Sequence, residues 1–315
     1  MGGTLYVTEK FIKQLHANDK TAARANLIPG LPRYVLPTTN YEAFDANAFV
    51  RNHRGSVYDT MDLALAAVTD GRGDAMILLP GGHVPTASLV MDKAGLSVWG
   101  MEAWMGYKVR KPSAVVTGPG TGDGMAITVP DVSFHGITCV PVTAKNWATF
   151  DGGADGLTVR NCYFDLATPV VNIATQGFTG SAAIEDLSWH GNTAWSDGAQ
   201  GPVLEITGAN LNCLIDWNHY HVDAGTWAVA VSLISPDGIR VEHDVATCGG
   251  TAMTACFDGS GTTVIAGVVF KDCRKGVLVT LFVDGFGTTT HAELVGNHTA
   301  TIGAGTGETL ITVIT

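Results

Sequence analysis

The sequence is poor in charge and especially poor in basic residues. Only 15% of its 315 residues are charged, and 18 Lys and Arg stand against 29 Asp and Glu, which gives a formal net charge of −11. A chain without a basic stripe lacks the positive surface that follows a phosphate backbone. The acidic balance also disfavours docking on anionic lipid. We therefore expect neither nucleic acid nor a membrane as a partner.

Long apolar runs and closely spaced cysteines are missing as well. No window approaches the roughly 20 uninterrupted apolar residues of a transmembrane helix, and the first residues lack the charged-then-apolar pattern of a secretory signal. The six cysteines never form a C-x-x-C pair, so reduced and mostly buried thiols are favoured over a zinc site. We expect no metal, no cofactor and synthesis in a reducing cytoplasm.

The sequence does contain a repeat. From about residue 130 onward, short runs rich in Val, Ile, Thr, Phe and Trp end in a small or amide-bearing residue, and more β-forming residues and a Gly/Asp turn follow. A period of roughly 20–50 residues is typical of solenoids, and two-residue alternation in short runs favours strands. The runs span 132–139, 157–164, 187–192, 214–219, 239–244, 268–273 and 292–297.

The amide and acid residues at the ends of these runs predict a ladder. They recur at intervals of 25 to 31 residues, and stacked asparagine side chains can hydrogen-bond to one another along a repeat axis. We expect them to align at one corner of successive coils; the alternative is that they are unrelated turn residues. The members are Asn161, Asn192, Asn218 and Asn297, with Asp244 and Asp272 as imperfect ones.

Residues 56–100 predict the first coil. An amphipathic stretch over 56–68, with Ser56 as its N-cap, predicts a helix that covers the open end of the solenoid and hides an unpaired sheet edge. The apolar segment 75–80 predicts a buried strand, and further strands are expected over 86–91 and 96–100.

This order of segments resembles a known family. A helix, then Met76-Ile-Leu-Leu-Pro-Gly-Gly-His83, then Leu96-Ser-Val-Trp-Gly100 and repeated Val-x-x-Asn coils are similar to the pectate-lyase-like β-helix superfamily, and within it to the phage tailspike and virion-spike branch. The resemblance covers roughly residues 50–310 and brings no diagnostic catalytic motif. It implies an all-β, right-handed parallel β-helix that assembles as a homotrimer.

Residues 1–50 differ in character, so we expect an N-terminal arm (1–50) followed by the β-helix (51–315). A short helix is predicted over 8–17, and an extended, proline-punctuated segment over 31–37. So small a segment cannot bury a core alone. We interpret it as an attachment segment that uses Phe11, Ile12 and Leu15; the alternative is a helix folded back on its own solenoid.

Candidate chemistry gathers in the middle of the chain. Glycoside hydrolysis needs two carboxylates about 5–10 Å apart, and Glu185, Asp186 and Asp197 lie near Trp189 and Trp195, whose flat apolar faces would suit a sugar. The alternative is that these are ordinary acidic turns and tryptophans at an inter-chain seam. We therefore favour no catalytic residue and keep the three acids as candidates.

A metal site is a second possibility on the same stretch. His219 and His221 lie on one face of a predicted strand, and Asp223 follows them closely. Two imidazoles and a carboxylate are suitable ligands for a transition metal. Ordinary surface polar residues are the favoured interpretation.

The expected function follows from the resemblance and the acidic exterior. We expect a non-enzymatic bacteriophage virion protein, a homotrimeric spike or decoration protein on the capsid or tail. It would be made in the bacterial host cytoplasm, anchored to capsid or tail proteins by its arm and displayed on the virion surface. The alternative is a tailspike that binds and hydrolyses a host surface polysaccharide. A free polysaccharide-degrading enzyme is the weakest reading, because no secretory signal is recognised.

Overall fold

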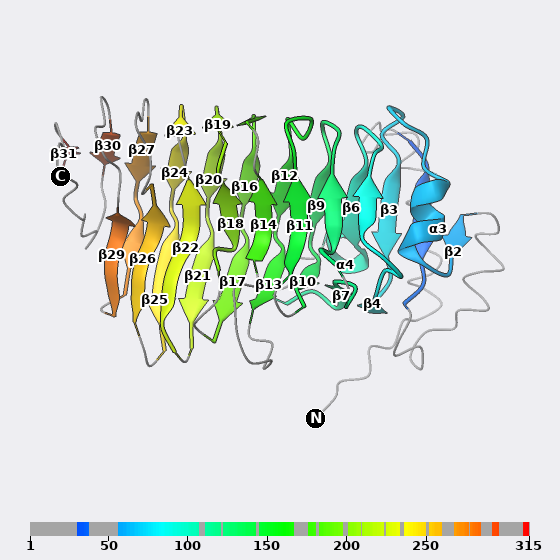
Figure 1. Cartoon of the computed structure of the whole chain (residues 1–315), viewed down its shortest axis with the longest axis horizontal. Coiled ribbons are helices and arrows are strands. Elements are labelled where there is room, and N and C mark those ends of the chain that lie inside the picture. The colour runs from blue at the N-terminus through cyan, green and yellow to red at the C-terminus, as the bar shows by residue number, and fades with distance from the viewer. Residues whose placement is uncertain are drawn as a thin grey trace.

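The computed structural model describes residues 30–37, 56–106, 111–120, 122–142, 145–166, 176–180, 183–197, 201–208, 210–223, 225–233, 236–249, 252–259, 268–276, 278–284, 292–295 and 311–314. Over these residues the chain winds into a parallel β-helix, whose coils are stacked along one axis from the N-terminal to the C-terminal end (Figure 1). This confirms the predicted all-β solenoid.

Each wall of the coil is a sheet whose strands come from successive turns, and all the strand pairs are parallel. Sheet A runs β2 (Val57–Tyr58), β1 (Pro32–Val35), β3 (Ala75–Leu78), β6 (Ser97–Gly100), β9 (Ser133–His135), β12 (Thr158–Arg160), β16 (Ser188–His190), β20 (Leu214–Asp216), β24 (Arg240–Glu242), β27 (Val268–Lys271), β30 (Ala292–Val295), β31 (Ile311–Ile314). The predicted repeats supply its strands from β9 to β30.

Sheets B and C form the other two long walls, and a short sheet D fills a corner. Sheet B runs β28 (Arg274–Lys275), β25 (Val245–Cys248), β21 (His219–Val222), β17 (Thr193–Ser196), β13 (Tyr163–Leu166), β10 (Thr138–Val140), β7 (Ala114–Thr117), β4 (Gly81–His83). Sheet C runs β29 (Val279–Asp284), β26 (Met253–Asp258), β22 (Trp227–Leu233), β18 (Leu204–Ile206), β14 (Gln176–Gly180), β11 (Asn146–Phe150), β8 (Met125–Ile127), β5 (Leu89–Met91). Sheet D holds β15 (Ile184–Glu185), β19 (Asn210–Leu211) and β23 (Pro236–Asp237).

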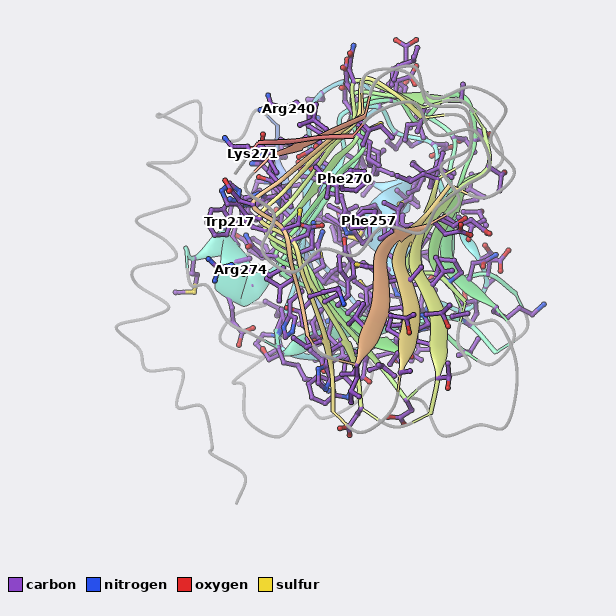
Figure 2. All side chains as sticks on the ribbon, turned by 90° about the vertical axis from the view of Figure 1, so that its left-hand side faces the viewer. Trp217, Arg240, Phe257, Phe270, Lys271 and Arg274 are labelled. Atoms are coloured by element: carbon purple, nitrogen blue, oxygen red, sulfur yellow. The ribbon has the colours of Figure 1, made fainter. Side chains whose placement is uncertain are left out.

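The core is a set of apolar columns inside the coil. On sheet A, the in-register pairing stacks one inward residue of each strand on the next, because side chains alternate between the two faces of a strand. Viewed along the axis, Phe257 and Phe270 lie inside the ring of sheets (Figure 2). The sheet A column contains Val98, Phe134, Val159, Trp189, Ile215, Val241 and Phe270, all buried.

The bend between sheets A and B has two residues, which have the same conformation and orientation in successive coils. Its first residue has a positive φ, between 51° and 64° at Asn161, Gly191, Trp217, His243 and Asp272. Its second residue is buried and faces inward. Glycine is suited to the first position at Gly191 for a further reason: an added Cβ would lie 2.7 Å from Asn161 Oδ1 in the coil below.

The second residue of the bend builds a hydrogen-bonded ladder inside the protein. The Cys162 N–H donates to Asn192 Oδ1 (3.0 Å), the Asn192 N–H to Asn218 Oδ1 (2.9 Å), and the Asn218 N–H to Asp244 Oδ1 (2.8 Å). The Asn192 and Asn218 amides donate to backbone carbonyls of the preceding coil, each at 3.0 Å. Each coil thus satisfies backbone groups that its neighbour would otherwise bury unpaired.

The structure places Asn192, Asn218 and Asp244 in this ladder and corrects two other members. Asn161 and Asp272 occupy the positive-φ position, one residue before the ladder. Cys162 and Cys273 are buried at the ladder position instead. Asn tolerates the left-handed region better than most residues do, so an amide suits either position of the bend. Asn297 lies outside the described residues.

The N-terminal end of the core is covered by α3 (Met61–Ala66). The helix is shorter than predicted, and its N-cap is Thr60, whose hydroxyl accepts the Leu63 N–H at 3.3 Å, rather than Ser56. Val57 and Tyr58 pair with β1 as a strand, which delays the start of the helix. Met61 and Leu65 close the apolar interior.

The second helix, α4 (Met101–Trp104), lies against the outer face of sheet A near the same end. There Met101 joins Tyr34, Ile77 and Leu79 in a small second core. Trp104 packs edge-on against Trp99, with ring centroids 5.9 Å apart. Within the described part of the chain, no helix combines the length and apolarity needed to cross a membrane.

The predicted boundary at residue 50 is wrong for one segment of the arm. Residues 32–35 form β1, which pairs with β2 on one side and with β3 on the other. The buried Asp74 carboxylate holds this strand, because Asp74 Oδ1 accepts the Leu31 N–H at 2.8 Å. The segment is extended, as expected, but belongs to the solenoid. Phe11, Ile12 and Leu15 lie outside the described residues.

The ladder ends on an acid. Asp244 is fully buried, and burial raises its pKa to about 8, although hydrogen bonds from Asn218 and Tyr220 act in the opposite direction. The Tyr220 hydroxyl donates to Asp244 Oδ2 at 3.2 Å. A protonated carboxyl has both an acceptor and a donor, as an asparagine amide has. Burial therefore favours the neutral form of Asp244 at this asparagine position.

Replacement of Asp244 by Asn should stabilise the protein in a pH-dependent way. The unfolded carboxyl ionises above about pH 4, whereas the folded one stays protonated to about 8, so native stability falls as the pH rises between these values. We expect Asp244→Asn to be more stable by on the order of 4 kcal/mol at neutral pH, and equal to the wild type below about pH 4. Denaturant unfolding across this range measures the difference.

The exposed Asp131→Asn variant is the matched control, since Asp131 shares no part of the ladder. Parallel stability–pH curves for the wild type and Asp244→Asn would contradict the neutral carboxyl.

Candidate functional site

A groove lies on the outside of the bend between sheets A and B. Its volume is about 470 Å³, and strands β20, β21, β24, β25, β27 and β28 flank it. Trp217 and Arg274 project from the same side of the coil, away from the core (Figure 2). The lining residues are Trp217, Asn218, His219, His243, Val245, Asp272 and Arg274.

Trp217 is the prominent residue of this groove. Its side chain is 59% exposed, and its ring stacks on that of His243 with centroids 4.2 Å apart and an interplanar angle of 7°. Single exposed apolar side chains are common on proteins. Trp217, however, also has a φ of 59°, a conformation that is unfavourable for a bulky residue. The bend requires this φ in successive coils, so a tryptophan where Gly or Asn suits the backbone makes Trp217 a candidate for binding.

Around the groove, the acidic side chains have basic partners, whereas two basic side chains have no acidic partner among the described residues. The carboxylates have basic partners: Asp216 lies 2.8 Å from His190, Glu242 2.5 Å from Arg240, and Asp272 3.6 Å from His243. In the described part of the chain, neither Lys271 nor Arg274 forms an ion pair. Both lie on the same side of the coil as Trp217 (Figure 2), and Arg274 lines the groove with it.

This arrangement has the chemistry of a carbohydrate-binding site. The indole offers a large, flat and rigid apolar surface on which the C–H face of a sugar ring can pack. Imidazole, carboxylate and guanidinium groups beside it can hydrogen-bond to hydroxyls in defined directions. The groove extends over successive coils on the outer side of the bend, so it suits a chain ligand that lies across the surface.

A second cluster lies farther along the same strands. The Trp195 and His221 rings are 4.1 Å apart on neighbouring coils, and Trp195 is half-buried. His219 Nε2 and His221 Nδ1 both lie within hydrogen-bond distance of the Thr247 hydroxyl, at 2.8 and 2.7 Å. A hydroxyl has one hydrogen, so it donates to one imidazole and accepts from the other. Over the described residues, no group of three His, Cys, Asp or Glu is arranged to hold a metal ion.

Two acidic residues that follow neighbouring strands of sheet B are brought together because the coils stack. Asp197 and Asp223 follow Ser196 and Val222, which are paired residues of β17 and β21. Adjacent coils therefore place their backbones about 4.8 Å apart. Burial and the nearby Asp223 and Asp165 raise the pKa of Asp197. A carboxyl with a raised pKa beside a second carboxylate can act as a proton donor.

Glu185 and Asp186 do not join this pair. Glu185 ends β15 in sheet D, and Asp186 is an exposed turn residue with a φ of 57° before β16. Strands β16 and β17 and the bend between them separate these acids from Asp197. The carboxylates that were grouped by sequence thus lie at different corners of the coil.

The prediction that Trp189 binds a sugar is wrong. Its side chain is fully buried, and its ring stacks on Phe164 with centroids 5.1 Å apart. Trp189 points inward because it stands two positions before the positive-φ residue of its bend, as Ile215 and Val241 do in later coils. Trp195 remains on the outer surface.

Sequence reasoning missed the groove itself. Trp217, His243 and Asp272 lie in the predicted repeat runs, and the sequence predicts no binding role for them or for Arg274. The signal was present: a Trp and a His occupy bend positions that hold Asn161 and Gly191 in earlier coils. Bulky residues where Gly or Asn suits the backbone are a departure that can be recognised once the register of the bend is known.

Comparison with solved structures finds proteins of similar fold. A pectin methylesterase in complex with a hexasaccharide has a TM-score of 0.51, with 10% identity over 90% of this chain and 92% of that chain. Weaker likenesses are a rhamnogalacturonan lyase (TM-score 0.44, 9% identity, 91% and 85% covered) and a pectin methylesterase from Erwinia chrysanthemi (0.43, 11%, 90% and 92%).

At these identities the likeness establishes the fold alone. The chain has the pectate-lyase-like right-handed parallel β-helix fold. No protein-family model and no curated protein sequence matches it. The phage branch of the superfamily remains a prediction from the sequence.

The two tryptophans should differ in their effect on stability. Trp189→Ala leaves a large cavity in the core and should cost about 3–5 kcal/mol. Trp217→Gly removes an exposed ring and relieves an unfavourable φ, so its stability should stay within about 1 kcal/mol of wild type. Denaturant unfolding measures both values. A loss above about 3 kcal/mol in Trp217→Gly would show that Trp217 is a structural residue.

Proposed function

We propose that this protein is a carbohydrate-binding β-helical spike of a bacteriophage particle, and that the groove at Trp217 is its glycan site. The observation that carries the proposal is the exposed Trp217, stacked on His243 in a groove that also contains imidazole, carboxylate and guanidinium groups. The bend imposes a positive φ at the Trp217 position in successive coils, where Gly or Asn suits the backbone. A tryptophan at this exposed position is therefore not explained by the fold, and contact with a flat ligand would explain it.

The ligand chemistry is supported by the composition of the groove. An aromatic plate with hydrogen-bonding groups at its edge matches a sugar, which has apolar C–H faces and polar hydroxyl edges. The in-register coils also provide a rigid base, and rigid supports lower the entropy cost of binding. A host surface polysaccharide is a ligand that a particle-borne spike would meet first.

Binding should depend on Trp217 and not on the tryptophans of the core. We expect wild-type protein to bind host capsule or lipopolysaccharide oligosaccharides in isothermal titration calorimetry, and Trp217→Gly to lose at least about tenfold in affinity. Trp217→Gly suits this test because glycine occupies the equivalent bend position at Gly191. Trp99→Phe, on the α4-covered part of sheet A, is the matched control and should bind normally. Unchanged binding by Trp217→Gly would remove the groove from the proposal.

A second candidate function is hydrolysis of the bound polysaccharide, which the Asp197–Asp223 pair favours. Retaining glycosidases use carboxyl groups about 5–5.5 Å apart, close to the spacing of adjacent coils. The raised pKa of Asp197 suits the acid, and Asp223 would be the nucleophile. Incubation with host polysaccharide would then release new reducing ends, and Asp197→Asn and Asp223→Asn would each abolish the release. Intact polysaccharide after incubation with wild-type protein would leave binding as the function.

Variants of the N-terminal segment test how the protein attaches to the phage particle. We propose that residues before β1 attach the spike to a capsid or tail protein, and that the rods associate as a homotrimer. Deletion of residues 1–28 keeps β1 and the Asp74 contacts, so the rod should fold while incorporation into particles is lost. Replacement of Phe11, Ile12 and Leu15 by Ser should have the same effect, whereas Lys13→Ser should not. Normal incorporation of the deletion variant contradicts the attachment role.

A further inference from the structure

We propose that the groove at Trp217 selects acidic saccharides, with Arg274 as the residue that binds a sugar carboxylate. This inference rests on the proposed glycan-binding function and specifies its ligand class. It starts from the charge pattern around the groove in a chain whose formal net charge is −11.

Register places Arg274 where it can reach the ligand. Arg274 pairs with Val245 of β25, which pairs with His219 of β21, so the three side chains form one outward column on sheet B. All three line the groove together with Trp217. A ring stacked on the indole would therefore present its edge substituents to this column.

The guanidinium of Arg274 is available for an anion. Arg274 is exposed and forms no ion pair with the described residues. The nearest carboxylate in sequence, Asp272, instead approaches His243, with Oδ2 3.6 Å from Nε2. An arginine can bind a carboxylate through two parallel N–H···O bonds, which gives both affinity and orientation.

A second cation reinforces the same region. Lys271 lies beside Glu242 in the register of β24 and β27, but the Glu242 carboxylate is 2.5 Å from Arg240. Lys271 has no ion pair in the described part of the chain and lies on the same side as Trp217 and Arg274 (Figure 2). A repeating acidic saccharide would thus meet Arg274 in the groove, and Lys271 outside the groove on the same side of the coil.

Acidic sugar units should be disfavoured at the other edge of sheet B, where strands β17 and β21 end. There Asp197 and Asp223 concentrate negative charge, and the pKa of Asp197 is raised partly by Asp223. An acidic unit would be repelled from that end. The charge pattern therefore also fixes where along the strands the carboxylate of a bound chain lies: at the Trp217–Arg274 end.

The test compares uronic-acid hexasaccharides with the same compounds after their carboxyl groups are reduced to alcohols. Isothermal titration calorimetry with a panel of such pairs should give wild-type protein at least about tenfold tighter binding to one acidic compound than to its neutral counterpart. Arg274→Gln should lose this preference and keep the affinity for the neutral compound. Added salt should weaken binding of the acidic compound only.

Arg160→Gln is the matched control, because Arg160 is an exposed arginine on sheet A outside the groove, and its preference should equal that of wild type. Equal affinity for acidic and neutral compounds, or an unchanged preference in Arg274→Gln, overturns the inference while the proposed function stands. If no compound of either kind binds, the proposed glycan function fails as well.

Discussion

The bend between sheets A and B is the constraint on which the rest of the structure depends. A coil in a solenoid contacts only its two neighbours, so the backbone groups at its corners must be satisfied by those neighbours or buried without partners. Asn192, Asn218 and Asp244 meet this need, since each accepts the ladder N–H of the preceding coil. Because these bonds join equivalent residues, they fix the register of both adjoining sheets.

The same bend connects the interior to the candidate site. Its buried second residue belongs to the ladder, so its first residue must point outward with a positive φ. Any side chain placed there is displayed at the surface by the backbone that holds the core. Trp217, His243 and Asp272 use this display in three successive coils. The hydrogen bonds of the ladder therefore also hold the backbone that carries the groove residues.

The sequence predicted the fold better than the site, for physical reasons. Alternating runs at a regular interval determine strands and coils, and these are local patterns. Whether a side chain points into the core or to the surface depends on its distance from the bend, and a shift of one position reverses its direction. Asn161 is predicted in the ladder but lies one residue before it, and Trp189 is predicted on the surface but is buried in the core. Spatial neighbours in a solenoid are about one coil apart in sequence. Asp197 therefore meets Asp223, one coil later, and not the nearer Asp186.

A crystal structure of the protein with a bound acidic oligosaccharide tests the central claim most directly. The account predicts a sugar ring packed on the indole of Trp217, with a carboxylate at Arg274 and the ladder unchanged behind it. A ligand bound instead on the outer face of sheet C, with Trp217 free of contacts, would contradict the claim that the bend builds the binding site.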